Sequence, residues 1–198
     1  MINSVENHVK EDARIIRTKR DLANALEELL QERNFDELSV KDITDKAMIS
    51  KNTFYNNFQD KNELLNFLFM RYKDELMKKI QPYLDHYVHA LRKIFFRTCL
   101  EKVVHAFYES NLPIDKMILA DKSKCLYWNI TKFIKEVLED LDKTYDHFLT
   151  SHADPMITSY FFAGAFASTL YFSILEDDKV TEDKIFKSLL KLAAPVAE

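Results

Sequence analysis

The sequence is poor in glycine, proline and cysteine, and each shortage narrows the fold. Its 198 residues include one glycine and four prolines, which argues against hairpins and tight turns, and no alternating run predicts a strand. So little glycine also argues against a phosphate-cradling loop, and no dinucleotide fingerprint or nucleophile elbow is present. The two cysteines, Cys99 and Cys125, provide no disulfide framework. We therefore expect long helices joined by short links, no enzyme activity and no cofactor.

The N-terminus lacks the apolar core of a signal peptide, which together with the cysteine usage predicts a reduced, cytoplasmic setting. Residues 155–175 contain no charged side chain and are long enough to span a bilayer. Polar residues are scattered through this segment, however, and its flanks are acidic rather than basic. We favour a helix that is buried on two sides, by its own domain and by a partner subunit, and we expect no membrane partner.

Some histidines have a spacing that metal sites use. His86 and His89 lie beside Asp85, and His147 and His152 are also close in sequence. Paired histidines on a solvated helix are common without a metal, and no further ligand follows nearby. We therefore predict no metal site.

Apolar periodicity and capping residues predict an all-α fold of about nine helices. After a loose stretch at residues 1–10, the first helix should run from about 11 to 33, where Asn34 closes it in a left-handed conformation. The later helices are expected at 40–47, 50–58, 60–81, 85–110, from 113, 123–148, from 155, and 181–194. We expect a three-helix domain at 1–60 and a helical domain at 61–198, joined directly by the fourth helix.

Two short helices follow the first. Ser39 and Asp42 have the spacing of a capping box, so a helix should begin there, with Met48 in the turn that follows it. Ser50 caps the next helix. Its Phe54 and Phe58 lie four residues apart, so both rings project into a core. This is the pattern of a helix-turn-helix unit.

The remaining side chains of that short helix are polar, and none is acidic. Amides read base edges and lysine binds phosphate oxygens, so this face suits nucleic acid. The net charge of −4 does not by itself suggest a nucleic-acid binder, but basic residues crowd the N-terminus. These are Lys10, Arg14, Arg17, Lys19 and Arg20. We therefore expect a modest basic face on a mildly acidic protein.

The run from Thr18 to about Leu65 resembles the DNA-binding domain of the TetR/AcrR family of bacterial repressors. The matching residues are Leu22, Ala25, Phe35, Ser39, Val40, Ile43, Ala47, Ser50, Thr53, Tyr55, Phe58, Lys61, Glu63 and Leu64. The family usually has glycine where this chain has Asn34, Met48 and Asn52. A left-handed residue with a Cβ costs roughly 1–2 kcal/mol, so either the turn at Met48 adopts another geometry or it carries that strain.

The resemblance implies DNA contacts from the two short helices and the start of the fourth, with Tyr55 and Lys61 on phosphates. The expected DNA-contact residues are Ser39, Thr44, Ser50, Lys51, Asn52, Thr53, Tyr55, Asn56, Asn57 and Lys61. Arg17 and Lys19 add to the grip on the backbone. The remainder of the chain matches only in helical layout.

By the same resemblance, the C-terminal part senses a ligand and forms a dimer through its last two helices. The expected ligand pocket is lined by Tyr83, Tyr87, Leu91, Phe95, Cys99, Tyr108, Tyr127 and Phe161. Taken one by one, these residues are better explained as ordinary core. The expected dimer interface contains Ala163, Gly164, Ala167, Ser168, Tyr171 and Leu189. Gly164 sits mid-helix, where it costs about 1 kcal/mol against alanine, and close helix packing is one reason to accept that cost.

These expectations combine into a homodimeric, ligand-responsive repressor. It would bind a near-palindromic duplex operator with half-sites about 34–36 Å apart, and a small apolar effector would be its ligand. An alternative is a TetR-like co-activator or protein-interaction module that does not read DNA on its own, which the turn at Met48 and the net charge favour. An all-helical enzyme would need a metal or cofactor that the sequence does not indicate.

Overall fold

The computed structural model describes residues 2–87, 92–109, 114–122, 124–145, 154–175 and 181–193. Within these ranges the chain is helical apart from its turns, and no strand occurs, as the sequence predicts. The elements are α1 (Ile2–Glu32), the 3-10 turn η1 (Phe35–Glu37), α2 (Val40–Ala47), α3 (Lys51–Tyr55), α4 (Lys61–Tyr87), α5 (Arg92–Tyr108), α6 (Ile114–Ala120), α7 (Cys125–Thr144), α8 (Pro155–Leu175) and α9 (Glu182–Ala193).

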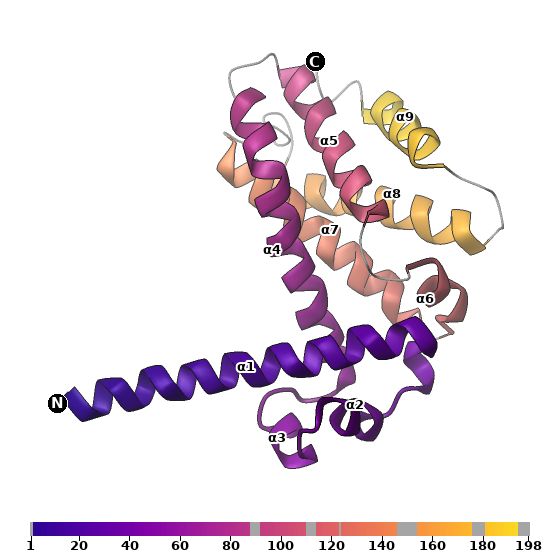
Figure 1. The fold of residues 1–198 in the computed structure, drawn as a ribbon. Coiled ribbons are helices and arrows are strands. Elements are labelled where there is room, and N and C mark those ends of the chain that lie inside the picture. The colour runs from indigo at the N-terminus through magenta and orange to yellow at the C-terminus, as the bar shows by residue number, and fades with distance from the viewer. Residues whose placement is uncertain are drawn as a thin grey trace.

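The helices form two regions that α4 connects (Figure 1). The N-terminal head, residues 2–60, has α1 lying across α2 and α3, and the N-terminal part of α1 extends beyond them. The C-terminal bundle consists of α5 to α9 and the second half of α4, with α7 packed against α4 and α8, and α5 against α9. Buried side chains of both regions belong to one continuous apolar core.

Polar contacts fix the angle between the head and α4. The Arg71 guanidinium on α4 lies 2.6 Å from Asn24 Oδ1 and 2.5 Å from a carboxylate oxygen of Glu27, both on α1. The neighbouring Tyr72 hydroxyl donates to the other oxygen of the same carboxylate at 2.5 Å. Burial raises the pKa of Tyr72, so this phenol stays protonated as a donor.

Several predicted helix boundaries are wrong, among them the start of the fifth helix near 85 and the end of the seventh near 148. The first helix begins at Ile2 rather than near residue 11, and α4 continues through Pro82 to Tyr87 rather than ending before the proline. An interior proline costs roughly 3 kcal/mol because it removes a helical hydrogen bond and crowds the preceding turn. Two contacts offset this cost: Leu84 is fully buried, and the Gln81 amide donates to the Tyr145 hydroxyl at 2.6 Å.

The predicted left-handed end of the first helix is also wrong. Asn34 has φ −70° and ψ 140°, which is extended backbone. The chain instead enters η1, where the Asn34 side-chain amide donates to Glu37 Oε1 at 3.2 Å and the Glu37 amide donates to the Asn34 carbonyl at 3.0 Å. The helix therefore needs no residue with positive φ at its end.

The capping predictions for the last two helices are confirmed. The Asp154 carboxylate accepts hydrogen bonds from the amides of Met156 and Ile157, and the Thr181 hydroxyl accepts one from Lys184. Among the described helices, none combines the length and apolar character needed to cross a bilayer.

Candidate nucleic-acid interface

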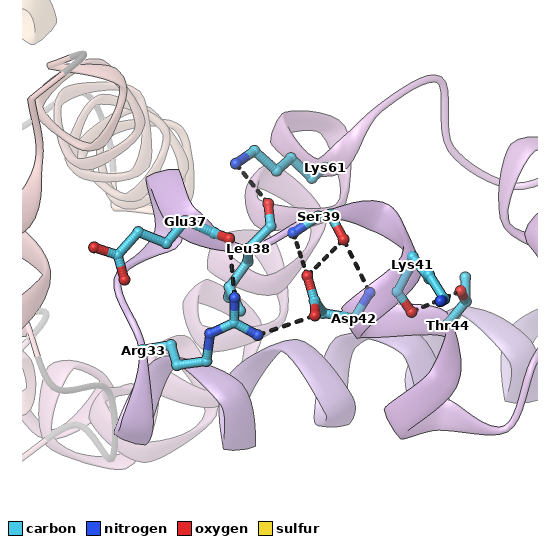
Figure 2. Close-up of polar contacts among 8 residues, drawn as sticks. All are labelled: Arg33, Glu37, Leu38, Ser39, Lys41, Asp42, Thr44 and Lys61. Carbon is cyan, nitrogen blue, oxygen red and sulfur yellow. Dashed lines mark hydrogen bonds and ion pairs between the residues drawn. The ribbon is translucent and has the colours of Figure 1, made fainter.

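The start of α2 is held by a reciprocal cap (Figure 2). The Ser39 hydroxyl accepts from the Asp42 amide at 3.2 Å, and the Asp42 carboxylate accepts from the Ser39 amide at 2.8 Å. Arg33 at the end of α1 donates to the same carboxylate at 3.0 Å. The hydrogen bonds from the Ser39 side chain and backbone, and then that from Arg33, hold the pKa of Asp42 well below its usual value. The capping box is confirmed, and it ties α2 to α1.

The turn between α2 and α3 carries backbone strain. Met48 has φ 54° and ψ 38°, the left-handed region, with its side chain 94% exposed. The Met48 amide donates to the Asp45 carbonyl and the Ile49 amide to the Thr44 carbonyl, which is the paired pattern of a Schellman helix end. The chain thus keeps the left-handed geometry and carries a cost of roughly 1–2 kcal/mol.

Helix α3 is anchored by two aromatic rings and by its cap. Phe54 and Phe58 are both buried, with their ring centroids 5.9 Å apart, and Phe58 also packs against Phe67 of α4. The Ser50 hydroxyl accepts from the Thr53 amide at 3.1 Å. A five-residue helix is too short to be stable alone, so this burial sets its orientation.

The anchoring leaves polar side chains of α3 at the surface. Lys51, Asn52, Tyr55 and Asn56 are exposed, as is the capping residue Ser50. Thr53 and Asn57 are half-buried, and the Asn57 amide donates to the Thr53 carbonyl at 2.8 Å. The arrangement can offer an ammonium, amides and a hydroxyl to a groove of nucleic acid. Contact of each residue with DNA stays a prediction.

Two residues of α2 that were expected at the interface have internal roles. Thr44 is only 2% exposed and its hydroxyl donates to the Lys41 carbonyl at 3.1 Å, so its assignment to the DNA surface is wrong. Ser39 is exposed, but its hydroxyl donates to the Asp42 carboxylate at 2.5 Å. A phosphate would have to compete with that bond.

Lys61 has its donors occupied within the head. Its ammonium donates to the carbonyls of Phe35 and Leu38 at 2.8 Å each and lies 3.3 Å from the carbonyl of Asp36 (the Leu38 bond is drawn in Figure 2). It also lies over the Phe35 ring, 4.6 Å from the centroid. The structure therefore makes Lys61 a clamp between α4 and η1, and a phosphate contact would require one of these bonds to be given up.

A groove between α1 and α3 adds residues that the sequence analysis did not place at the site. It has a volume of about 600 Å³ and is lined by Arg14, Ile15, Thr18, Lys19, Thr53, Asn56 and Asn57. Lys19 was expected to contact the DNA backbone and Arg14 only to belong to the basic face, whereas Ile15 and Thr18 were not assigned. Their spacing of three and four residues along α1, which puts them on one helix face, is the signal that could have identified them.

The expected pocket residues fall into three groups. Cys99 is buried and Tyr127 is half-buried, with its hydroxyl 3.0 Å from the Ser168 hydroxyl. Tyr83 is 51% and Phe161 is 66% exposed, so the subunit does not enclose either ring. The side chains of the others lie outside the described residues, namely Tyr87, Leu91, Phe95 and Tyr108. The pocket stays a prediction.

Most of the expected dimer-interface residues face inward. Ala163, Ala167 and Tyr171 are buried in the subunit's own core, and so is Leu189 on α9. Their assignment to a surface between subunits is wrong, because α8 packs against α7, and α9 packs against α5 and α8. Gly164 and Ser168 remain half-exposed.

For metals, the part of the chain that the structure describes contains no group of three potential ligands. The side chains of His86, His89, His147 and His152 lie outside it.

The family comparison agrees with this geometry. Residues 19–67 match the family described as bacterial regulatory proteins of the tetR family. These residues run from the C-terminal part of α1 to the first part of α4, and they include the whole of α2 and α3.

One curated relative is the HTH-type dhaKLM operon transcriptional activator DhaS of Lactococcus lactis. It is 30% identical over 99 residues, so the match covers 50% of this chain and about half, 51%, of the relative.

Solved structures share the fold over nearly the whole chain. The dihydroxyacetone kinase operon activator DhaS is 20% identical with a TM-score of 0.53, covering 91% of this chain and 96% of that one. A putative TetR-family regulator of Syntrophomonas wolfei is 15% identical with a TM-score of 0.58, covering 91% and 95%. A TetR regulator of Streptococcus agalactiae is 21% identical with a TM-score of 0.57, covering 93% and 98%. Residues 19–67 are thus similar to the tetR family of bacterial regulatory proteins, and the fold of the chain is similar to that of these solved structures.

Proposed function

We propose that this protein is a transcriptional regulator that binds a near-palindromic DNA operator as a homodimer and responds to a small ligand. The observation that carries the proposal is α3: Phe54 and Phe58 hold it rigidly, while Lys51, Asn52 and Asn56 face solvent. A short, fixed rod with amides and a cation on its free side matches the width and hydrogen-bonding groups of a major groove.

The homodimer is supported by an apolar stripe on α8. Ile157, Phe161, Gly164, Ser168, Phe172 and Leu175 follow one another at intervals of three and four residues, and the four large side chains among them are exposed. Trp128 on α7, 69% exposed, stands beside Tyr127, which packs against Phe172 with ring centroids 6.4 Å apart. Scattered apolar residues are normal on a surface, but a continuous row of this kind marks an interface.

Gly164 supports the same conclusion. It is the only glycine of the chain, it has no positive φ, and a Cβ built on it would meet nothing within 4 Å. In the described part of its own subunit nothing therefore requires glycine, although glycine inside a helix costs about 1 kcal/mol against alanine. A second helix that approaches closely at this point gives a reason for its presence.

Sedimentation of the purified protein at micromolar concentration tests the dimer. We expect the wild type to be dimeric and Phe161→Glu to be monomeric, because a charge would be buried in the interface. Leu119→Glu is the matched control, since Leu119 is equally exposed but lies on α6, outside the stripe. A monomeric wild type, or a Phe161→Glu variant that stays dimeric, contradicts the proposed interface.

Selection from a randomised duplex library tests DNA reading. The selected DNA sequence should be two-fold symmetric, with half-sites about 34–36 Å apart or a multiple of that distance. Asn56→Ala should blunt sequence preference, whereas Lys51→Ala should weaken binding to every sequence and lower the salt slope by about one. Lys116→Ala, on the exposed face of α6, should change neither. If the wild type binds no duplex, the co-activator alternative becomes the better account.

The direction of regulation is a separate proposal. Repression was the expectation from the family resemblance, whereas the DhaS relatives are named as activators. A reporter fused to the promoter that carries the selected operator decides between them: loss of the protein raises expression for a repressor and lowers it for an activator.

A further inference from the structure

We propose that the groove between α1 and α3 holds the sugar–phosphate backbone of one DNA strand, so that α1 is a second DNA-binding element. This inference rests on the proposed DNA-binding function and extends it from the α3 surface to a face of α1. The groove is open and has a volume of about 600 Å³. Its two walls are the Arg14–Lys19 segment of α1 and the Thr53–Asn57 face of α3.

The charge of the groove matches a polyanion. Of the residues whose side chains the structure describes, Arg14 and Lys19 line it and no carboxylate does. Among the described residues, no carboxylate pairs with Arg14, whereas Arg20 on the same helix is 3.3 Å from Asp21. The Lys19 ammonium lies 5.6 Å from the centroid of the buried Phe58 ring, which directs it toward α3. The fixed ammonium of Lys19 and the unpaired guanidinium of Arg14 thus both face the groove.

The neutral lining also suits a nucleic-acid strand. The hydroxyl of Thr18 and the amide of Asn56 are donors of the kind that contact phosphate oxygens. Ile15, which is half-exposed in the same groove, offers an apolar surface to a sugar ring. A guanidinium such as that of Arg14 can bind a phosphate through two parallel hydrogen bonds.

The position of the groove relative to α3 selects the DNA backbone as its occupant. A helix in the major groove is flanked by a phosphate backbone on each side. The Thr53–Asn57 face of α3 looks toward α1, while Lys51, Asn52 and Tyr55 lie on other faces of the helix. When α3 enters a major groove, the strand on the α1 side passes between the two helices. Asn56 then belongs both to the base-reading surface and to the backbone groove.

Titration of wild-type and variant protein with a fluorescent duplex about three helical turns long tests the inference. Salt is varied between about 50 and 200 mM. Arg14→Ala should weaken binding about three- to tenfold for every sequence and lower the salt slope by about one, and Arg14→Glu should weaken it further. Arg20→Ala is the matched control and should change affinity less than twofold. All variants should melt at the wild-type temperature, because these side chains are exposed.

Single uncharged methylphosphonate linkages then locate the contact. At one backbone position beside the half-site, neutralisation should weaken the wild type but not Arg14→Ala. If Arg14→Ala keeps the full salt slope while Lys51→Ala lowers it, the groove inference is wrong and the proposed function stands. If the wild type binds no duplex at all, both are wrong. Equal losses for Arg14→Ala and Arg20→Ala would indicate a diffuse charge effect and would also overturn the groove.

Discussion

The two regions of the molecule are held together by different means. In the N-terminal head, side-chain hydrogen bonds hold each short element. Ser39 and Asp42 cap α2, Ser50 caps α3 by bonding to Thr53, and Lys61 bonds to the backbone of η1. In the C-terminal bundle, long helices rely on apolar packing, and α8 leaves an apolar stripe uncovered. The difference teaches that the head fixes its short elements with polar bonds as well as buried rings, whereas the bundle leaves a surface that a partner would complete.

The largest test of this comparison removes one of the two rings that fix α3. Phe54→Ala should cost about 3–5 kcal/mol of stability, because a fully buried ring leaves a cavity in a small region. Hydrogen exchange should show the loss concentrated in α2 and α3, while α7 and α8 stay protected. Phe172→Ala, on the exposed stripe, is the control and should reduce dimer formation more than subunit stability. A loss below about 1 kcal/mol for Phe54→Ala would show that the head does not depend on this anchor.

Removal of the Lys61 clamp should have the next largest effect. Lys61→Ala should cost about 2 kcal/mol in chemical denaturation, because three carbonyls lose a charged donor. Lys51→Ala is its control and should leave stability unchanged, since Lys51 is exposed. If Lys61→Ala is as stable as the wild type but binds DNA with a smaller salt slope, Lys61 is a phosphate ligand rather than a clamp.

Relief of strain in the turn should act in the opposite direction. Met48→Gly should raise stability by about 1 kcal/mol, because glycine accepts the left-handed geometry without a Cβ clash. Met48→Ala should give no such gain, since alanine keeps the Cβ. Thermal melting of the three proteins measures both effects, and a gain with alanine equal to that with glycine would place the cause elsewhere.

The smallest expected effect is a dependence on acid pH. The pKa of Asp42 is lowered in the folded protein, so its contribution is present above the unfolded pKa of about 4 and is lost as pH falls toward the folded value. The difference in stability between the wild type and Asp42→Asn should therefore become smaller as the pH falls below about 4. Melting temperatures recorded across this range provide the measurement. A gap that is constant with pH would mean that the cap does not titrate.

The sequence predicts the head better than the bundle, and the reason is the range of the interactions. The caps at Ser39, Ser50 and Asp154 join residues two or three positions apart, so their spacing is visible in the chain. Asn34 was predicted wrongly because its conformation depends on η1. The internal bonds of Lys61 could not be predicted because its acceptors lie more than twenty residues away, and its contact with phosphate stays a prediction.

The orientation of α8 could not be predicted for a different reason. No charged residue occurs between Pro155 and Leu175, so the sequence contains nothing that marks the exposed side. The predicted interface residues Ala163 and Ala167 therefore lie on the buried side of α8. The exposed stripe that contains Ile157 and Phe161 lies part of a helical turn away and was not predicted as the interface. Packing against neighbouring helices, mainly α7 but also α6 and α9, decides which side of such a helix is covered.

The turn between α6 and α7 touches both regions at once. The Tyr171 hydroxyl of α8 donates to Asp121 at its start, the Lys122 amide donates to Asp36 in η1, and the Cys125 thiol donates to Asn62 at the start of α4. Tyr171 is next to Phe172, which lies on the stripe of the proposed dimer. In such a dimer, the geometry of this one loop helps to set how far apart the two copies of α3 stand. Substitutions at Asp121 would then change the spacer length that is accepted between half-sites, and would leave the choice of bases within each half-site as it was.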